Sequence, residues 1–289
     1  MIMKPFLGTD ISEDKKSEKI NGSEFLAVKP SEALQGAFDS AVDSACRTQE
    51  SAKLPKPLRV VKWICGAAAA IIVAAVAKAL ARADVTFSQA HLNAPYLFWI
   101  GGICLVVWAV LFFASSRKET AVLESDEGSY SIQKLDSMVG TVLAELGVPQ
   151  DAKSVDILKF KYVVKNDEIK PKLATAFDRT QYENSEFKIF SDESSLYFAD
   201  VYGKYEIPLD ELVGIRTVNK RISVSVWNKE TPPTKGEFKQ FKLKTNDYGD
   251  VFFKPYYILE FNHNGEQWGI YFANYDLPAY EEATGLKAQ

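Results

Sequence analysis

Two long runs of apolar residues dominate the hydrophobic pattern in the first half of the chain. The first run, residues 63–81, carries one charge, Lys78, near its end, where a long side chain can reach a membrane interface. The second run, residues 95–116, has no charge and is slightly longer than the roughly 20 residues that a spanning helix needs. The polar first 30 residues are not a cleavable signal peptide. We therefore predict a two-helix transmembrane hairpin over residues 63–116.

Flanking charges predict how this hairpin is oriented. The segments before and after it are basic, through Lys53, Lys56, Arg59, Lys62, Arg117 and Lys118. The connector, residues 82–94, has one arginine and one aspartate. Because basic flanks stay on the cytoplasmic side, we expect cytoplasmic N- and C-termini at a bacterial inner (plasma) membrane. The alternative is a buried helical hairpin in a soluble protein, which the charge-free residues 85–116 disfavour.

The first span is rich in alanine, which contributes little to membrane insertion. Spans of this kind associate through small residues that let two helices approach closely. The candidate helix-packing face is Gly66, Ala70, Ala74 and Ala77 in the first span, with Gly101 and Gly102 in the second. This face could also bring together two or more copies of the chain.

Before the hairpin, the pattern predicts a tail and one helix. Residues 1–30 have mixed charge and little periodicity, so we expect a mobile N-terminal tail. Residues 31–62 are expected to form an amphipathic helix and a connector, with Ser31 as a candidate N-cap. The helix could lie on the membrane surface or pack against the soluble domain. Its acidic polar face favours packing, because surface helices on anionic lipid favour Lys and Arg.

After the hairpin, the hydrophobic period changes from that of a helix to that of strands. Residues 117–150 are a linker with a helix over residues 132–146, ended by Gly147 and Pro149. Residues 151–289 then hold short segments rich in β-branched and aromatic residues, at 155–164, 187–190, 196–199, 205–209, 214–218, 222–227, 256–262 and 267–272. The Asn264–Gly265 pair predicts a hairpin turn. Residues 276–284 are expected to form a closing helix.

The amino-acid sequences of several predicted strands resemble those of a known family. The segments LYFAD from residue 196, YEIPLDELVGI from residue 205, YYILEF from residue 256 and WGIYFANYD from residue 268 are similar to bacterial pleckstrin-homology-like (PH-like) domains attached to one or two membrane spans. The resemblance covers about residues 182–285. It implies an α+β chain in which the transmembrane hairpin precedes a cytosolic antiparallel PH-like β-barrel with a C-terminal helix.

Charge and composition restrict the classes of function that we expect. The 289 residues carry a net charge of -4, with +4 on residues 1–118 and -8 on residues 119–289. An acidic domain argues against nucleic-acid binding. The three cysteines have no C-x-x-C spacing, so neither a disulfide framework nor a metal site is indicated. His91 and His263 have no partner at motif spacing, and nucleotide-loop or hydrolase motifs do not occur in the sequence. We expect no enzyme activity and no cofactor.

One lysine-rich segment is a candidate site for a partner or a lipid headgroup. Its members are Trp227, Lys229, Lys235, Lys239, Lys242 and Lys244. The resemblance adds that PH domains use basic loops for inositol phosphates. The alternative is that Lys242 and Lys244 form the solvent-facing side of a strand, because they alternate with Phe241 and Leu243.

These features lead to two hypotheses about function. The first is a non-enzymatic, membrane-anchored interaction or assembly protein, a scaffold that displays its PH-like domain to a protein partner or to another copy. The second is a two-span membrane effector, for example in antiviral defence. In that case the β domain would sense a small-molecule ligand and trigger assembly of the spans in the membrane.

Overall fold

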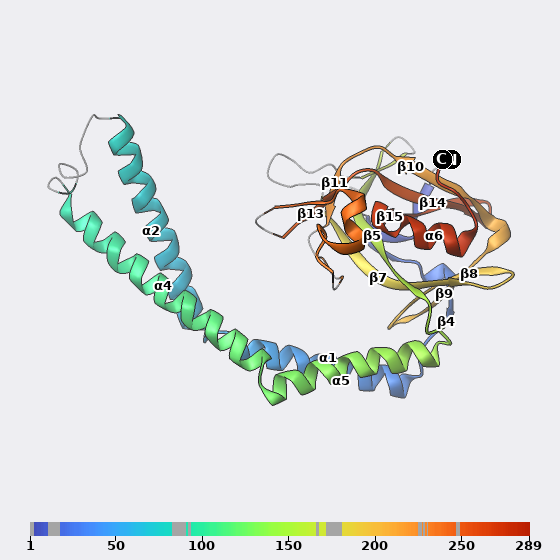
Figure 1. Cartoon of the computed structure of the whole chain (residues 1–289), viewed down its shortest axis with the longest axis horizontal. Helices are drawn as coiled ribbons and strands as arrows, with labels where there is room; N and C mark the ends of the chain where they lie inside the picture. Colours follow the sequence, from blue (N-terminus) through green and yellow to red (C-terminus); the bar gives the residue numbers. More distant parts are fainter. Residues whose placement is uncertain are drawn as a thin grey trace. The chain divides into compact units, whose positions relative to one another are not determined.

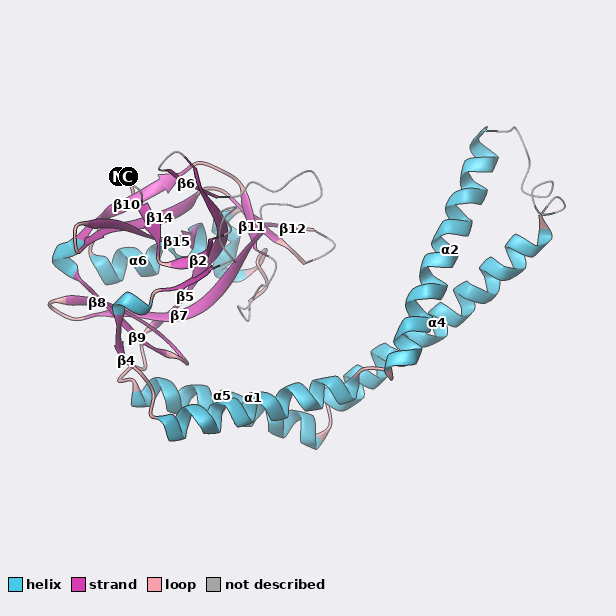
Figure 2. Ribbon diagram, turned by 180° about the vertical axis from the view of Figure 1, so that it is seen from behind, coloured by secondary structure: helices cyan, strands magenta, loops and turns pink. Residues whose placement is uncertain are grey.

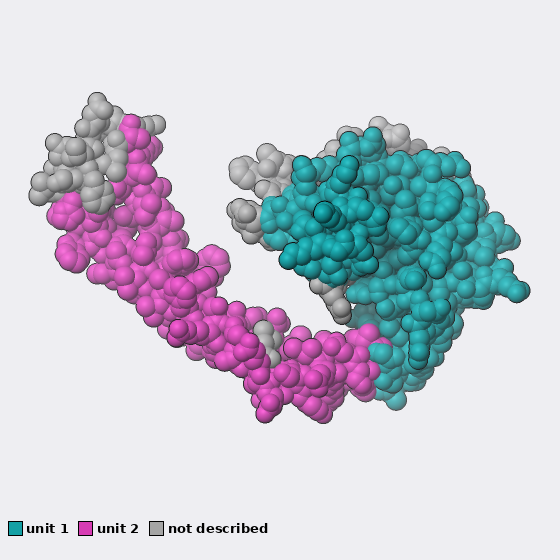
Figure 3. Space-filling model, viewed as in Figure 1, with its two compact units in different colours: residues 1–35, 140–289 teal, residues 36–139 magenta. Residues whose placement is uncertain are grey.

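The computed structural model contains long helices and a large sheet (Figure 1). It describes residues 3–10, 18–82, 91, 94–165, 168–171, 181–224, 227, 229, 231–246 and 249–289. The chain divides into two units: residues 1–35 with 140–289 form unit 1, and residues 36–139 form unit 2 (Figure 3). All of the described strands lie in unit 1 and most of the helical residues lie in unit 2, which confirms the predicted α+β class.

Two amphipathic helices flank the apolar ones. Helix α1 (Glu32–Ala52) and helix α5 (Asp126–Glu145) lie side by side in both ribbon views (Figures 1 and 2). Thr48 Oγ1 of α1 lies 3.4 Å from Ser131 Oγ of α5. The backbone N–H of Ser31, the expected N-cap, donates to Glu145 at the end of α5. The predicted helix after residue 31 is thus confirmed, and its protein neighbour is α5.

The two apolar helices are α2 (Lys56–Arg82) and α4 (Pro95–Leu123). Segments Lys56–Lys78 and Pro95–Val122 are long and apolar enough to cross a membrane. Only 6% of the most apolar stretch of the first is buried within the chain, and 0% of the second. A core helix of a soluble protein would bury these side chains. The connector between the helices lies largely outside the described residues, of which it includes only residues 82, 91 and 94.

The sheet of unit 1 is mainly antiparallel. Its longer strands are β5 (Lys153–Lys165), β7 (Gln181–Ser191), β8 (Ser195–Asp200), β9 (Gly203–Pro208), β10 (Leu212–Val218), β14 (Tyr256–His263) and β15 (Glu266–Ala273). The shorter strands are β1 (Met3–Pro5), β2 (Leu7–Asp10), β3 (Glu18–Asn21), β4 (Leu26–Val28), β6 (Glu168–Pro171), β11 (Ile222–Val224), β12 (Lys244–Thr245) and β13 (Val251–Phe253). Each predicted strand segment overlaps one of these, except that residues 225 and 226 lie outside the described part.

The strand order is β10-β14-β15-β5-β7-β11-β13-β12, with β8 and β9 joined through β7. Among the described residues, β10 and β12 at the two ends of this path do not pair with each other. The strand pairs therefore form a large antiparallel sheet but do not close the barrel that the sequence led us to expect.

The predicted hairpin turn is confirmed. Strands β14 and β15 pair in continuous register from Tyr256 opposite Ala273 to His263 opposite Glu266. Asn264 and Gly265 both have positive φ, 51° and 79°. Such angles match the twist of the flanking strands, which explains the Asn-Gly pair.

The expectation of a mobile tail over residues 1–30 is wrong for its described residues. Strand β1 pairs in parallel with β15, β2 pairs with β3 and β5, and β4 pairs with β9. The side chain of Phe6 is fully buried, with its ring 5.6 Å from that of Phe25. This segment belongs to unit 1, although some 100 residues of unit 2 separate it from β5.

Two apolar clusters fill unit 1. The first packs beneath the C-terminal helix α6 (Leu277–Thr284), where Tyr280 stacks on Phe272 with ring centroids 3.7 Å apart. The second cluster includes Phe238, Phe253 and Tyr275. Helix α6 confirms the predicted closing helix and ends at Gly285, whose φ of 69° suits glycine.

Candidate functional site

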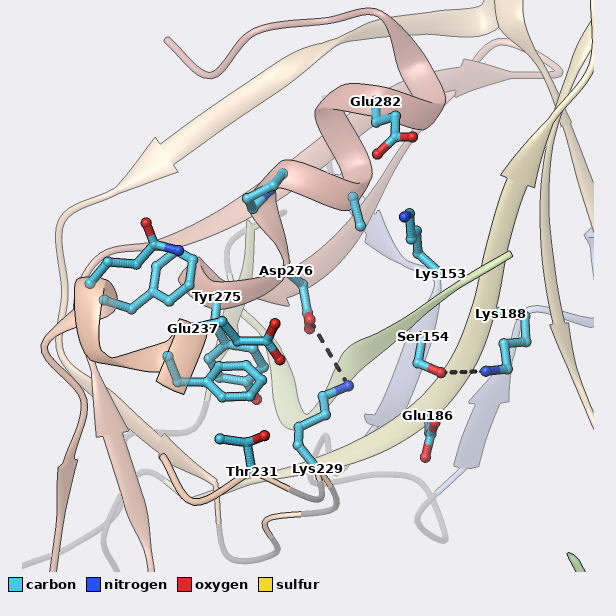
Figure 4. A pocket seen from close by; sticks show the side chains of 15 residues that line it. Lys153, Ser154, Glu186, Lys188, Lys229, Thr231, Glu237, Tyr275, Asp276 and Glu282 are labelled. Carbon is cyan, nitrogen blue, oxygen red and sulfur yellow. Dashed lines mark hydrogen bonds and ion pairs between the residues drawn. The ribbon is translucent and has the colours of Figure 1, made fainter. Parts of the chain in front are cut away.

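A cavity of about 740 Å³ opens in unit 1 (Figure 4). Strands β5 and β7, the 3₁₀ helices η3 (Gly236–Phe241) and η4 (Asn274–Asp276), and the start of α6 line it. Its volume lies in the range of pockets that hold small molecules.

The register of β5 and β7 supplies one wall. Ser154 of β5 lies opposite Lys188 of β7, and Asp156 lies opposite Glu186. Because alternate residues of a strand share a face, these four residues lie on the same side of the sheet. The Lys188 ammonium donates a hydrogen bond to Ser154 Oγ.

A buried ionic network lies beside this wall. Asp156 is fully buried and Asp276 is 5% exposed. The Asp156 backbone N–H donates to Asp276 Oδ2 (2.8 Å), and the Tyr275 hydroxyl donates to Asp156 Oδ2 (2.9 Å). Lys229 Nζ lies 3.5 Å from Asp156 Oδ1 and 4.0 Å from Asp276 Oδ1. Buried carboxylates need such partners, because an isolated buried charge is very costly.

Burial also changes proton affinities in this network. Burial raises the pKa of Asp276 well above its ordinary range, while the Lys229 ammonium acts in the opposite direction. Burial, with the nearby Asp156 charge, raises the pKa of Tyr275 well above its usual value. Tyr275 therefore remains a hydroxyl donor, and Asp276 takes up a proton more readily than an exposed aspartate.

The ammonium of Lys229 has capacity for another contact. Its Nζ atom is buried and forms no hydrogen bond with any described residue, because both carboxylates approach only at ion-pair distance. Figure 4 shows this Nζ pointing toward Asp276 inside the cavity. Leaving the donors of a buried ammonium unused is energetically costly.

The remaining lining combines exposed charged side chains with an aromatic wall. Lys153, Glu186, Glu237 and Glu282 are exposed and line the cavity. Phe238 packs edge-on against Tyr275, with ring centroids 5.9 Å apart. The cavity therefore presents positively and negatively charged groups together with an apolar surface.

The structure separates the members of the predicted lysine-rich segment. Trp227 packs edge-on against Tyr275 at 5.2 Å, and Lys229 enters the buried network. The other four, Lys235, Lys239, Lys242 and Lys244, are exposed. The alternative interpretation is confirmed for Lys244, which is exposed in strand β12. It is wrong for Lys242, which follows η3 with a left-handed φ of 52°.

The candidate helix-packing residues fall into two groups, those at the contact between α2 and α4 and those that are exposed. A Cβ atom added to Gly66 would lie 2.8 Å from the Trp108 ring, and one added to Gly101 would lie 2.9 Å from Ile72. These two glycines thus lie where α2 and α4 meet. Ala70, Ala74 and Ala77 are exposed, and a Cβ atom added to Gly102 would meet nothing within 4 Å.

Residues far apart in sequence form contacts that sequence reasoning missed. His263 Nδ1 lies 2.8 Å from Glu211 Oε2, a partner 52 positions away. Asp156 and Asp276 were not singled out at all. One available signal was the position of Asp156 between Val155 and Ile157 in an otherwise apolar stretch, where a charged residue indicates a buried partner.

The described residues contain no group of three or more His, Cys, Asp or Glu side chains placed to hold a metal ion. Comparison with known proteins finds no matching protein family, curated protein or solved structure.

Proposed function

We propose that this chain is a non-enzymatic, membrane-anchored interaction protein. Helices α2 and α4 cross the membrane, and unit 1 is a PH-like domain that binds a protein partner or a second copy. The observation that carries the proposal is the exposure of large apolar side chains along both helices, including Trp63 (77% exposed), Trp99 (70%) and Phe113 (64%).

The energetics favour a membrane around these helices. Transfer of one large apolar side chain out of water is worth roughly 1.5–3 kcal/mol. Water would have to solvate many such side chains along α2 and α4. Trp63 lies near one end of the hairpin, and Tyr96 and Trp99 lie near the other. Aromatic residues at these positions suit the two membrane interfaces.

The basic end of the hairpin supports cytoplasmic termini in a bacterial inner membrane. The Lys118 ammonium donates to the backbone oxygen of Lys53 (2.9 Å), which brings the chain segments before α2 and within late α4 together. Arg59 forms an ion pair of 2.6 Å with Glu50 beside them. Basic clusters of this kind remain on the cytoplasmic side.

The PH-like assignment draws support from strand order. Antiparallel strands β5, β7–β10, β14 and β15 precede one C-terminal helix, α6, which packs on the first apolar cluster. The parallel strands β1 and β2 are additions to the resembled pattern.

The non-catalytic part of the proposal draws support from the cavity. A nucleophilic serine needs a neighbouring base that takes its proton. Ser154 instead accepts a hydrogen bond from the Lys188 ammonium. Asp156 and Asp276 are held by Lys229, Tyr275 and backbone, as in a structural or binding network.

Alkaline carbonate extraction of membranes from expressing cells tests the anchor. We expect the full chain to stay in the membrane pellet and to dissolve only in detergent. A matched variant, Val106→Lys with Val110→Lys, should lose this resistance, because each central charge costs roughly 2.5–3.5 kcal/mol of insertion. Release of the unchanged chain into the carbonate supernatant would overturn the proposal. Purification in mild detergent then tests for a foreign protein at fixed ratio or for a homo-oligomer.

A ligand-triggered membrane effector is the second candidate. It is favoured by an apolar groove of about 380 Å³ between α2 and α4, which Gly102 lines and leaves open. An effector should be toxic when triggered and lose toxicity on Gly102→Leu, whereas a tether should tolerate the change. Gly102 is a better test position than Gly101, where a larger side chain would also disturb Ile72 within the hairpin.

A further inference from the structure

The cavity of unit 1 contains a buried cation whose hydrogen bonds are incomplete. Lys229 has three N–H donors, and its Nζ forms no hydrogen bond with a described residue. The Oδ2 atoms of Asp156 and Asp276 already accept bonds from Tyr275 and from backbone, so each aspartate offers only Oδ1 at ion-pair distance. A ligand oxygen in the cavity would complete the donors of Lys229.

The local charge restricts what such a ligand can be. Two aspartates surround Lys229, and the lining adds Glu186, Glu237 and Glu282 as well as Lys153 and Lys188, so carboxyl groups outnumber ammonium groups here. None of these three glutamates forms an ion pair with a described residue. A ligand that carried only negative charge would face repulsion from these carboxylates. The same molecule therefore needs a positive group for the glutamates and an anionic oxygen for Lys229.

The rest of the lining sets the size and polarity of the ligand body. A cavity of about 740 Å³ holds a small organic molecule rather than a single ion. Phe238, Phe241 and Ala279 supply an apolar wall. Glu237 and Lys229 are drawn on the same side of the cavity, next to Tyr275 and Asp276 (Figure 4).

We propose that this cavity binds a small zwitterion, namely an α-amino acid with an apolar side chain. The ligand carboxylate accepts hydrogen bonds from Lys229 Nζ. The ligand ammonium lies against Glu237, and the apolar side chain lies against Phe238 and Phe241. The proposal holds whether or not α2 and α4 cross a membrane, so its failure and that of the anchor are separate results.

Calorimetric titration of the full chain in detergent tests the ligand class. Phenylalanine is the probe, and two analogues each lack one charged group: phenethylamine lacks the carboxylate and 3-phenylpropionate lacks the ammonium. Since a hydrogen bond to a charged group is lost in each case, we expect phenylalanine to bind at least roughly tenfold more tightly than either analogue. Equal binding of all three, or no saturation by phenylalanine, would overturn the proposal.

Two variants test the assigned contacts. Glu237→Gln should weaken phenylalanine binding roughly tenfold, because the contact with the ligand ammonium is lost. It should not weaken 3-phenylpropionate binding, because one of the carboxylates that repel this anion is neutralised. The matched control, Glu193→Gln, changes an exposed carboxylate in the turn between β7 and β8 and should have no effect. An unchanged affinity in Glu237→Gln would contradict the proposed pose.

The contact with Lys229 is tested in a charge-balanced background, Lys229→Met with Asp156→Asn. This variant should bind phenylalanine and phenethylamine equally weakly, because the partner of the carboxylate is gone. Retained preference for phenylalanine in a folded variant, checked by circular dichroism, would show that Lys229 does not bind the ligand carboxylate.

Discussion

Replacement of Lys229 by methionine should destabilise unit 1 strongly. The substitution keeps an apolar stem of similar length but removes the Lys229 ammonium from Asp156 and Asp276, which are 0% and 5% exposed. Removal of one partner from a buried ion pair typically costs about 3–5 kcal/mol. Because Lys229 lies 3.5 and 4.0 Å from the two carboxylates and forms no hydrogen bond with described residues, we expect the lower end, about 3 kcal/mol.

The loss of unfolding free energy in Lys229→Met, called the deficit below, should change with pH in one direction. Burial raises the pKa of Asp276 in the folded chain, so the native state binds a proton more readily than the unfolded state. The contribution of such a carboxyl to stability is complete below its unfolded pKa and is lost as pH rises through the folded value. Without Lys229 that pKa rises further. The deficit of Lys229→Met should therefore shrink as pH falls from about 7 to about 5.

Urea unfolding of the full chain in detergent, followed by the fluorescence of buried Trp268, measures this free energy. Adding Asp156→Asn to Lys229→Met should recover part of the loss, because one of the two buried carboxyl groups that Lys229 faced then carries no charge. The exposed Lys239→Met is the control and should change stability by less than about 0.5 kcal/mol. A deficit below about 1 kcal/mol at neutral pH, or one that grows on acidification, would refute the reasoning.

Three further substitutions have clear expected outcomes. Tyr280→Phe should raise the unfolding free energy by about 1 kcal/mol in the same urea assay, because the Tyr280 hydroxyl is buried without a described partner; a loss would contradict this. Hydrogen bonds from the backbone N–H groups of residues 194 and 195 lower the pKa of Asp192 to about 2, so Asp192→Asn should be less stable than the parent at neutral pH. The difference in unfolding free energy between the parent and Asp192→Asn should vanish as pH falls from about 4 to about 2. A difference that does not change with pH would contradict this explanation. Gly66→Leu should lower the helical melting temperature in detergent by clashing with Trp108, whereas Gly102→Leu should not; equal melting would exclude the proposed contact.

Local sequence signals account for the elements that could be predicted. The two apolar runs, the helix after Ser31, the Asn264–Gly265 turn and the helix before Gly285 each depend on residues within a few positions of one another. Length, capping residues and positive φ are readable from such short windows.

Contacts between distant residues account for what could not be predicted. The segment around Phe6 appears polar and aperiodic, and its structure comes from pairing with β5 and β15 more than 140 positions later. Asp156 and Asp276 are 120 positions apart, and neither segment on its own shows that the two residues meet. Lys229 appeared to be one of several surface lysines because the sequence does not show which lysine meets the buried carboxylates.

Membrane topology is the most direct test of the central claim that α2 and α4 cross the membrane twice. In a chain with Cys65 and Cys104 replaced by alanine, native Cys46 precedes the hairpin, and a Ser88→Cys substitution marks the connector. Intact spheroplasts are treated with a membrane-impermeant maleimide. We expect the thiol introduced into the connector to react in intact spheroplasts, and Cys46 to react only after lysis. Labelling of Cys46 in intact spheroplasts, or of neither position until lysis, would contradict the two-span account.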